Sequence, residues 1–302
     1  MPYLPLRTVA LPHEADALFR EWLAGVDEAL DDPRVDRNDL CREILEDLYG
    51  VRADTEAGPE AHLGAQTAAQ LGSDSTRRAL TRRVVRAQFD PRNVTLEPEF
   101  YAETDIEQYA RVKPLLWLWE MFDRSPVGEN VSLGIAFRRL LARRIFRHCG
   151  RNFKAFPFVR LTFGYNLEVG DDVIVHRHVL LDDRGGIELG DGCSISDFAN
   201  VYSHTHDVVD GRIVENRRTV LGAGVRVTYH ATILAGTRVE PGAMIGAGAM
   251  LTRDAEARGI YVGVPARQVA IKNADALAAR RPSSPDPLAD EEPSTHEDAG
   301  DA

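Results

Sequence analysis

The feature that most constrains this chain is an aliphatic residue that returns every six positions along its second half. An apolar heptad or a simple alternating strand would repeat at a different period. Six-residue self-similarity is typical of a parallel β-helix, in which each short strand points one side chain into a prism before the chain bends. The sequence therefore predicts a mainly β solenoid filled by these residues. The repeat consists of Leu161, Leu167, Val169, Val175, Leu181, Leu189, Ile195, Val201, Leu221, Val227, Ile233, Val239, Ile245 and Leu251.

The repeat has one long interruption, which begins after Val201. It starts with Tyr202-Ser203-His204-Thr205-His206-Asp207 and continues as a polar stretch to Arg218. A stretch this polar must leave the prism and lie on its surface. Insertions in solenoids collect on one face, often the binding face, and function concentrates in loops held by a rigid scaffold. We therefore expect the interruption to carry the functional site.

Two histidines, His204 and His206, lie near the start of this interruption. An imidazole titrates close to neutral pH, so it suits a general base that takes a proton from a hydroxyl during attack and returns it later. Residues two apart on an extended strand face the same side, so both rings line one site if the strand continues that far. The alternative for either ring alone is a surface or structural histidine.

The composition restricts the possible classes of function. The chain has 302 residues, 44% of them hydrophobic, and a formal charge of -11, which argues against general nucleic-acid binding through clustered Lys and Arg. No apolar run reaches membrane-spanning length and the N-terminus lacks a secretory-signal pattern, so we expect a soluble, cytoplasmic protein. The widely spaced Cys41, Cys149 and Cys193 support neither a disulfide framework nor a cysteine zinc site. We expect free thiols, with Cys193 packed inside the repeat.

The first half of the chain has helical patterns. We divide the chain into an α-helical N-terminal domain (1–148), a β-helix domain (149–272) and a disordered acidic tail (273–302). A second helix is expected to be capped at Asp36 or Asn38 and to end at Gly50, before a loop over 53–74. We expect the helices to cover one end of the prism, where strand edges are unpaired. The first helix carries a stripe of Leu18, Trp22, Leu23, Val26 and Leu30, and later helices are predicted within 76–88, 109–122 and 131–148.

The segment from Phe137 to His148 is an amphipathic helix rich in arginine. The first interpretation is a solvated basic face opposite a packed one. The alternative is peripheral contact with an anionic membrane surface. Its arginines are Arg138, Arg139, Arg143, Arg144 and Arg147.

Four short motifs, which follow one another in order, carry a family resemblance. They are Val169-Gly170-Asp171-Asp172-Val173, Leu189-Gly190-Asp191-Gly192, the IGAGAMLTRD segment from Ile245 to Asp254, and VGVPAR from Val262 to Arg267. Over roughly residues 150 to 272 the chain resembles the left-handed β-helix hexapeptide-repeat acyltransferases, in particular the galactoside, maltose and polysaccharide O-acetyltransferase branch. The resemblance implies a left-handed β-helix, acetyl-CoA as acyl donor, a sugar or glycan hydroxyl as acceptor, and a homotrimer with active sites between subunits.

The resemblance also implies roles for individual residues of the acceptor side. His206 falls where the family keeps its catalytic base, and His204 is held in reserve. Acceptor-binding residues are expected to be His176, Asp183 and Tyr202, although sugar-acetylating members commonly carry Asn where His176 stands. The implied reaction is direct acyl transfer without a covalent acyl-enzyme.

The donor is expected to bind along coils that follow the interruption. Small residues there leave room for the pantetheine arm, although corners of the prism favour glycine whether or not anything binds. Hydroxyl and cationic side chains near the C-terminal end suit the phosphates. Arg226 stands where related enzymes often have Trp. The expected donor-binding residues are Gly246, Ala247, Gly248, Ala249, Thr252, Arg253, Arg267 and Lys272.

Two alternative functions remain open at this stage. Another class of hexapeptide-repeat proteins binds zinc through histidines of adjacent subunits and hydrates carbon dioxide, and three imidazoles with a water form such a site. The other alternative is a noncatalytic scaffold. We predict no metal site, and the acceptor stays open among a sugar, a glycan or lipid-linked intermediate, and an amine on a nucleotide sugar. The histidines that raise the zinc alternative are His176, His178, His204, His206 and His230.

Overall fold

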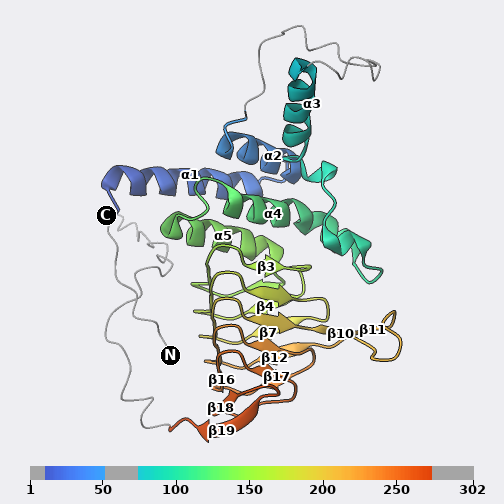
Figure 1. Cartoon of the computed structure of the whole chain (residues 1–302). Helices are drawn as coiled ribbons and strands as arrows, with labels where there is room; N and C mark the ends of the chain where they lie inside the picture. The colour runs from blue at the N-terminus through green and yellow to red at the C-terminus, as the bar shows by residue number, and fades with distance from the viewer. Residues whose placement is uncertain (1–10, 52–73, 274–302) are drawn as a thin grey trace, which may run out of the picture.

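The computed structural model describes residues 11–51 and 74–273 and has two parts, a set of helices stacked on one end of a columnar β-helix (Figure 1). The predicted tail from residue 274 and the predicted loop up to residue 73 lie outside the described residues. Within residues 11–51 and 74–273, no helix has both the length and the apolar character that crossing a membrane requires.

The helices begin and end near the predicted positions. Asp36 accepts hydrogen bonds from the backbone amides of Asn38 and Asp39, so it is the cap of the second helix. In the first helix, Val26 and Leu30 are buried, whereas Leu18 is 62% exposed and lies off the stripe to which we assigned it. The helices are α1 (His13–Asp31), α2 (Arg37–Leu48), α3 (Asp74–Ala87), η3 (Pro91–Asn93), η4 (Glu97–Phe100), α4 (Ile106–Arg124) and α5 (Val131–Ile145).

Short parallel strands form the three faces of the column. One face has the strand order β1-β4-β7-β12-β15, the second β2-β5-β8-β13-β16-β18-β19 and the third β3-β6-β9-β14-β17, with only β19 antiparallel to its neighbour. Each coil of the chain thus adds one strand to each face. The predicted fold, a left-handed parallel β-helix preceded by helices, is confirmed.

The bounds of the strands are as follows: β1 (His148–Cys149), β2 (Lys154–Ala155), β3 (Arg160–Leu161), β4 (Leu167–Val169), β5 (Ile174–Val175), β6 (Leu180–Asp182), β7 (Ile187–Leu189), β8 (Ser194–Ile195), β9 (Asn200–Tyr202), β10 (His204–His206), β11 (Val214–Asn216), β12 (Thr219–Leu221), β13 (Arg226–Val227), β14 (Thr232–Ile233), β15 (Arg238–Val239), β16 (Met244–Ile245), β17 (Met250–Leu251), β18 (Gly259–Val262) and β19 (Arg267–Ile271).

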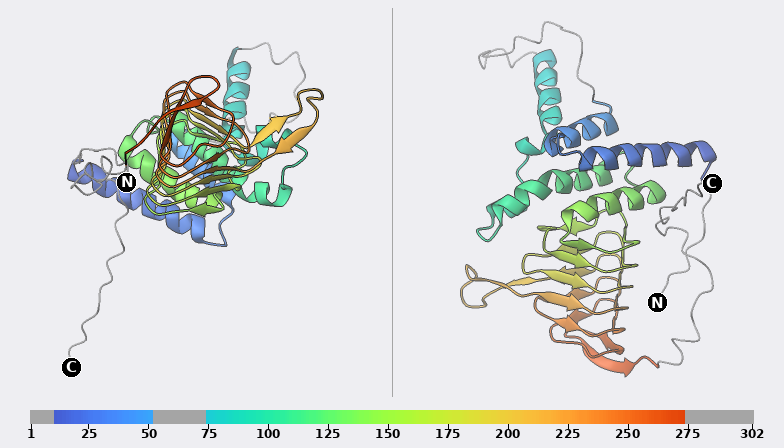
Figure 2. Two further views of the ribbon diagram at one scale, coloured as in Figure 1. Left: turned by 90° about the horizontal axis from the view of Figure 1, so that it is seen from below. Right: turned by 180° about the vertical axis from the view of Figure 1, so that it is seen from behind.

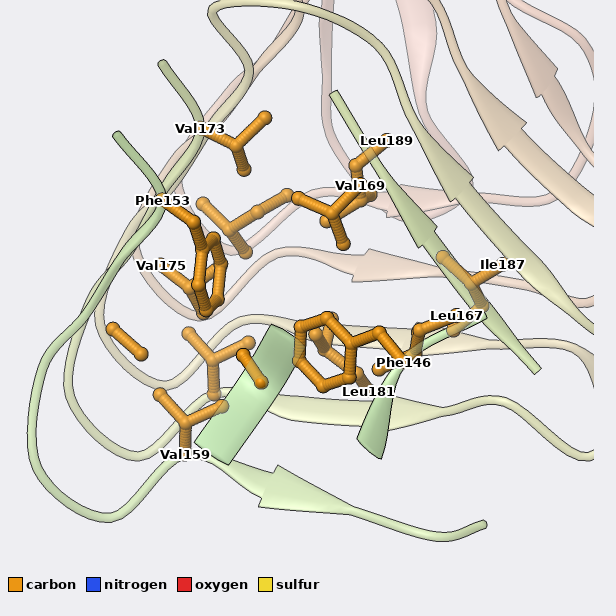
Figure 3. Packing of buried hydrophobic residues seen from close by; sticks show 14 of the residues in the cluster. Phe146, Phe153, Val159, Leu167, Val169, Val173, Val175, Leu181, Ile187 and Leu189 are labelled. Carbon is orange, nitrogen blue, oxygen red and sulfur yellow. The ribbon is translucent and has the colours of Figure 1, made fainter. Parts of the chain in front are cut away.

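The six-residue repeat fills the interior of the column, as predicted. Its members are at most 1% exposed, apart from Leu161 in the first coil, which is partly buried. The parallel register places Val175 beside Ile195 and Ile195 beside Val227, so equivalent side chains stack from coil to coil. Figure 3 shows repeat residues such as Val169 and Leu181 pointing into this shared core. Cys193 is buried there, and all three cysteines are free thiols, as predicted.

The helical part seals the N-terminal end of the column. Phe146, which follows α5, meets Phe153 of the first coil with ring centroids 5.5 Å apart, and Trp119 of α4 donates from Nε1 to the carbonyl of Val159 at 3.1 Å. Helices and coils therefore share one continuous apolar core (Figure 3). The predicted domain boundary between residues 148 and 149 falls inside β1, three residues after the end of α5, and it stays a prediction.

The arginine-rich helix α5 has a solvated basic face only in part, because Arg143 is exposed whereas Arg138 and Arg139 are buried. Arg138 is fully buried, and its Nε donates to Asp123 at 2.7 Å while a guanidinium NH2 group donates to the carbonyl of Ala155 at 3.2 Å. Arg139 is also buried and donates to the carbonyl of Phe153 at 2.7 Å. These two arginines are neither a solvated face nor a membrane-binding one. They donate hydrogen bonds to backbone carbonyl groups of the first coil, because no preceding coil is present to donate them.

The interruption leaves the column, as predicted, and the structure shows that it forms a β-hairpin. Strands β10 and β11 pair antiparallel, with His204 opposite Asn216 and His206 opposite Val214, and the hairpin projects away from the coils (Figure 2). The turn between β6 and β7 lies against the base of the hairpin. At Gly185 in this turn, a side chain would overlap the carbonyl of Ser203 and the amide of Arg217. Glycine therefore lets the coil pass under the root of the hairpin.

Candidate active site at the root of the hairpin

A pocket of about 480 Å³ lies where the hairpin leaves the column. One wall comes from the coils and the hairpin, and the other comes from η4 and the residues that follow it. This size falls in the range of small-molecule sites. The first wall includes Asp182, Tyr202, His204 and His206, and the second includes Glu97, Phe100, Tyr101 and Glu103.

His206 is held in one tautomer by its own hairpin. Its Nδ1 lies 2.8 Å from the carbonyl oxygen of Gly211. A carbonyl oxygen only accepts hydrogen bonds, so Nδ1 must carry the proton. The Nε2 atom of the neutral ring therefore keeps a free lone pair, which is the state that a general base needs.

His204 lies beside His206 but has a different environment. The two ring centroids are 5.5 Å apart, so β10 brings both imidazoles to one site, as the two-residue spacing predicts. The Nδ1 of His204 lies 2.5 Å from Oδ2 of Asp182, so the carboxylate is the direct partner of this ring. Burial lowers the pKa of His204, and the charge of Asp182 partly opposes this shift. Burial also raises the pKa of the Asp182 carboxyl, whose Oδ1 is buried without a hydrogen-bond partner.

Asp207, the carboxylate next to His206 in sequence, has a structural role. It accepts hydrogen bonds at 2.8 Å from the backbone amides of Val209 and Asp210. It thus stabilises the turn of the hairpin. The groups that orient the two imidazoles are the Gly211 carbonyl for His206 and Asp182 for His204, and neither is recognisable from sequence alone.

The predicted acceptor residues are not brought to one place. Tyr202 lines the pocket, and burial raises the pKa of its hydroxyl. Asp183 points the other way: it is fully buried and accepts from the amides of Phe163 at 2.7 Å and Asn166 at 3.1 Å. Burial raises the pKa of Asp183 to about 6. Its neighbour Asp182 lies in the pocket instead, so we transfer the proposed acceptor role to Asp182.

His176 lies away from this pocket. It follows β5 on another face of the column and stacks on Phe156 at 4.9 Å between ring centroids, and burial lowers the pKa of its imidazole. Its assignment as an acceptor residue therefore has no support within one described chain. A role for it would require a second subunit.

The wall supplied by the helical part was missed by sequence reasoning. Arg184, at the corner after β6, forms an ion pair with Glu103, and its guanidinium lies 4.0 Å from the ring centroid of Tyr101. The Tyr101 hydroxyl donates to Glu97, and burial together with this contact raises the pKa of Tyr101 to about 12. The only sequence signal was a run of acidic and aromatic residues from 97 to 103, which the helical pattern did not explain.

The predicted donor residues lie outside the histidine pocket. Gly246, Ala247, Gly248 and Ala249 form the corner between β16 and β17, where Ala247 and Gly248 are exposed. A side chain at Gly246 would overlap Val262, so this glycine has a packing role whether or not a ligand binds. One described chain does not join these residues to the histidines.

The predicted phosphate partners lie at the C-terminal end of the column. Thr252 and Arg253 follow β17 and are exposed, and Arg267 is exposed at the start of β19. Lys272 donates to the carbonyl of Gly242 at 2.6 Å, and burial lowers its pKa. These groups lie near one end of the column, and their role in phosphate recognition stays a prediction.

The histidines that raised the zinc alternative form two separate groups. His178 and His230 are stacked with Phe158 and Phe198 in a ladder of rings 4.8 to 4.9 Å apart, on a different corner from the hairpin. Among residues 11–51 and 74–273, no three His, Cys, Asp or Glu side chains gather so as to hold a metal ion. The zinc alternative therefore has no ligand set within one described chain.

The left-handed β-helix with a protruding histidine hairpin defines the structural class of the chain, the hexapeptide-repeat acyltransferase fold. A solved structure of galactoside acetyltransferase in complex with coenzyme A matches with a TM-score of 0.51 and 21% identity, over 59% of this chain and 88% of that one. At that identity the match establishes the fold. No protein-family model matches the chain.

The sequence relatives are acetyltransferases. The chain is 32% identical to probable serine acetyltransferase 1 of Oryza sativa subsp. japonica over 188 residues, which are 52% of this chain and 62% of the relative. It is 29% identical to serine acetyltransferase of Buchnera aphidicola subsp. Acyrthosiphon pisum (strain APS) over 111 residues, 36% of this chain and 40% of the relative. The chain thus spans less than two thirds of either relative. The predicted resemblance to hexapeptide-repeat acetyltransferases is confirmed.

Proposed function

We propose that this protein is an acetyltransferase that uses acetyl-CoA to acetylate a hydroxyl of a small molecule or glycan, with His206 as general base. The observation that carries the proposal is the hydrogen bond between Nδ1 of His206 and the Gly211 carbonyl, which leaves the lone pair on Nε2 of a ring that lines the pocket. The sequence relatives, which are acetyltransferases, and the structural neighbour with bound coenzyme A support this assignment of donor and reaction.

The proposed reaction is direct transfer. Nε2 of His206 removes the proton from the acceptor hydroxyl while its oxygen attacks the thioester carbonyl of acetyl-CoA. The tetrahedral intermediate then expels the CoA sulfur as a thiolate, which takes the proton from the imidazolium. The products are the O-acetyl ester and free CoA, and no covalent acyl-enzyme forms. A positioned base of this kind contributes about 10² to 10⁴ in rate.

His204, with Asp182 beside it, is the second candidate for the general base. The carboxylate lies next to Nδ1 of His204 and would stabilise an imidazolium there. If His206 is replaced, His204 is the neighbouring ring that can still accept a proton from the acceptor. We therefore assign His206 as the base and His204 with Asp182 as the groups that orient and polarise the acceptor.

We propose that the active site is completed in a homotrimer. The proposed donor corner at Gly246 to Ala249 and the histidine pocket lie apart in one chain, and a neighbouring subunit that presents its donor corner to the hairpin would join them. Val208 and Val209, at the tip of the hairpin, are 100% and 95% exposed, which favours their being covered by a partner.

The proposed function is tested by incubating the purified full-length chain with acetyl-CoA and a panel of sugars, amino sugars and amino alcohols. Thiol release that depends on the acceptor, together with an acetylated product in the mass spectrum, is the expected result. If the chain neither binds acetyl-CoA by calorimetry nor releases thiol with any acceptor, the assignment is wrong and a noncatalytic scaffold becomes the better account.

A further inference from the structure

The wall of the pocket that faces the histidines comes from the helical part of the same chain. The segment from Glu97 to Glu103 crosses the mouth of the pocket and is fastened to the column through Arg184, which pairs with Glu103 and lies under the ring of Tyr101. Arg184 is only 7% exposed, so this attachment is partly shielded from water. The contacts of Arg184 therefore hold this wall against the column.

The charges that line the pocket do not balance. Three carboxyl groups face it, those of Glu97, Glu103 and Asp182. Arg184 is the one permanently charged cation among its lining residues, and the imidazole of His204 lies beside Asp182. Arg184 is already paired with Glu103. The hydrogen-bond partner of Glu97 is the neutral hydroxyl of Tyr101. The pocket thus keeps an excess of negative charge, which favours a cationic ligand.

One of these carboxyl groups has an unused acceptor atom. Asp182 is 4% exposed, and its Oδ1 makes no hydrogen bond although it is buried at the pocket. A buried polar atom without a partner costs free energy, and a bound donor removes that cost. Because Oδ2 already lies against Nδ1 of His204, Oδ1 is the acceptor atom that Asp182 has left over.

Aromatic rings supply the rest of the pocket surface. Tyr101, Tyr202 and Phe100 line it, and Phe100 is 79% exposed at its mouth. The stacking of Arg184 on Tyr101 shows that these rings already accept a cation on their faces. Rings combined with carboxylates are a surface that recognises ammonium groups, through cation–π attraction and charge-assisted hydrogen bonds.

We propose that the acceptor carries a protonated amine beside the hydroxyl that is acetylated, and that Glu97 and Asp182 select it. This inference rests on the proposed function, because it names the acceptor class of the same site. An amino alcohol or amino sugar would place its ammonium between the two carboxylates. A neutral polyol of the same size offers hydrogen bonds but does not offset their charge.

The test measures binding first, so that it does not depend on turnover. Calorimetric or NMR titrations of the full chain compare two matched pairs, 2-amino-1,3-propanediol against glycerol and glucosamine against glucose, each pair differing by an ammonium in place of a hydroxyl. We expect the amine to bind about tenfold more tightly, or more, at low salt, and the preference to shrink as salt screens the charges.

Variants then assign the preference to residues. Glu97→Gln keeps the shape of the side chain and is expected to remove most of the preference, whereas Glu107→Gln, an exposed glutamate of α4 that does not line the pocket, should leave it unchanged. Asp182→Asn is the second variant, with its folding checked by circular dichroism. Equal binding of amine and polyol by the wild type, or a preference that survives in Glu97→Gln, overturns the inference.

Thiol release on the same samples separates the two proposals. Amine-selective binding without any acetyl transfer would show that the pocket selects ammonium ligands, but it would refute the proposed function and with it the role of the amine as acceptor. Acetyl transfer to polyols at the same kcat/KM as to their amine counterparts would uphold the function and refute the amine preference.

Discussion

The carboxylate of Asp182 in β6 lies 2.5 Å from Nδ1 of His204 in β10, because Asp182 is paired with Tyr202 and the chain reaches His204 two residues later. The solenoid thus joins two residues that are distant in sequence through the register of neighbouring coils. The pair contains a carboxyl whose pKa is raised by burial and an imidazole whose pKa is lowered by burial.

The first prediction concerns this pair. The charge of Asp182 raises the pKa of His204 against the larger effect of burial, so Asp182→Asn is expected to lower the pKa of His204 further. NMR titration of the His204 ring in the two proteins measures the shift. A pKa that stays constant or rises in the variant would show that the carboxylate does not act on this ring.

The second prediction concerns the buried pair that fastens the helices to the column. Arg138 is fully buried and Asp123 is 4% exposed, and Asp123 also accepts from the amide of Phe158 at 2.6 Å. Arg138→Met leaves a buried carboxylate without its cation, so we expect a loss of about 3 to 5 kcal/mol in the free energy of unfolding, measured with denaturant.

The matched control for that prediction is Arg143→Met, on the same helix but exposed. It should change the free energy of unfolding by no more than about 0.5 kcal/mol. Equal effects of the two substitutions would show that the pair does not stabilise the junction between helices and coils.

The third prediction concerns the pH dependence of stability. The pKa of Asp183 is raised by burial from 3.8 to about 6 in the folded chain, so the native state holds a proton that the unfolded state has already lost between these values. The stabilising effect of that proton is complete below pH 3.8 and is lost as the pH rises through about 6.

Relative to Asp183→Asn, the wild type should therefore lose up to about 3 kcal/mol of stability over this window, because one pKa unit corresponds to about 1.36 kcal/mol. Urea unfolding of both proteins at several pH values measures the difference. A difference that is flat with pH, or one that grows with pH in favour of the wild type, contradicts this account of the buried carboxyl.

The fourth prediction concerns assembly. We expect light scattering to show a trimer, and the double variant Val208→Asp/Val209→Asp to dissociate at least about tenfold more readily, because a buried unpaired carboxylate is costly. Leu18→Asp, at an exposed position of α1, serves as the control. A monomeric wild type with full activity would refute the proposed shared site.

Much of the fold could be predicted from the sequence because a solenoid repeats one local pattern. The residues from Leu161 to Leu251 fill the column as the six-residue period requires, and the polar interruption after Val201 forms the hairpin that carries both histidines. The N-terminal cap of α2 at Asp36 also follows from local chemistry.

The composition of the pocket and the burial of Arg138 could not be predicted from the sequence, because they depend on tertiary packing. At the corner after β6, adjacent residues point to opposite sides, so Asp183 turns into the core and Asp182 into the pocket, a difference that no spacing argument resolves. The wall formed by Glu97 and Tyr101 requires packing between parts of the chain about 80 residues apart, as between Glu103 and Arg184. The burial of Arg138 likewise depends on the end of the column that it covers.

The most direct test of the central claim is acetyl transfer by wild type, His206→Ala and His204→Ala, each confirmed to fold and to bind acetyl-CoA as the wild type does. If His206 is the base, its substitution lowers kcat by about 10² to 10⁴ while donor binding persists, and His204→Ala has the smaller effect. Unchanged turnover in His206→Ala would contradict the proposed role of this imidazole.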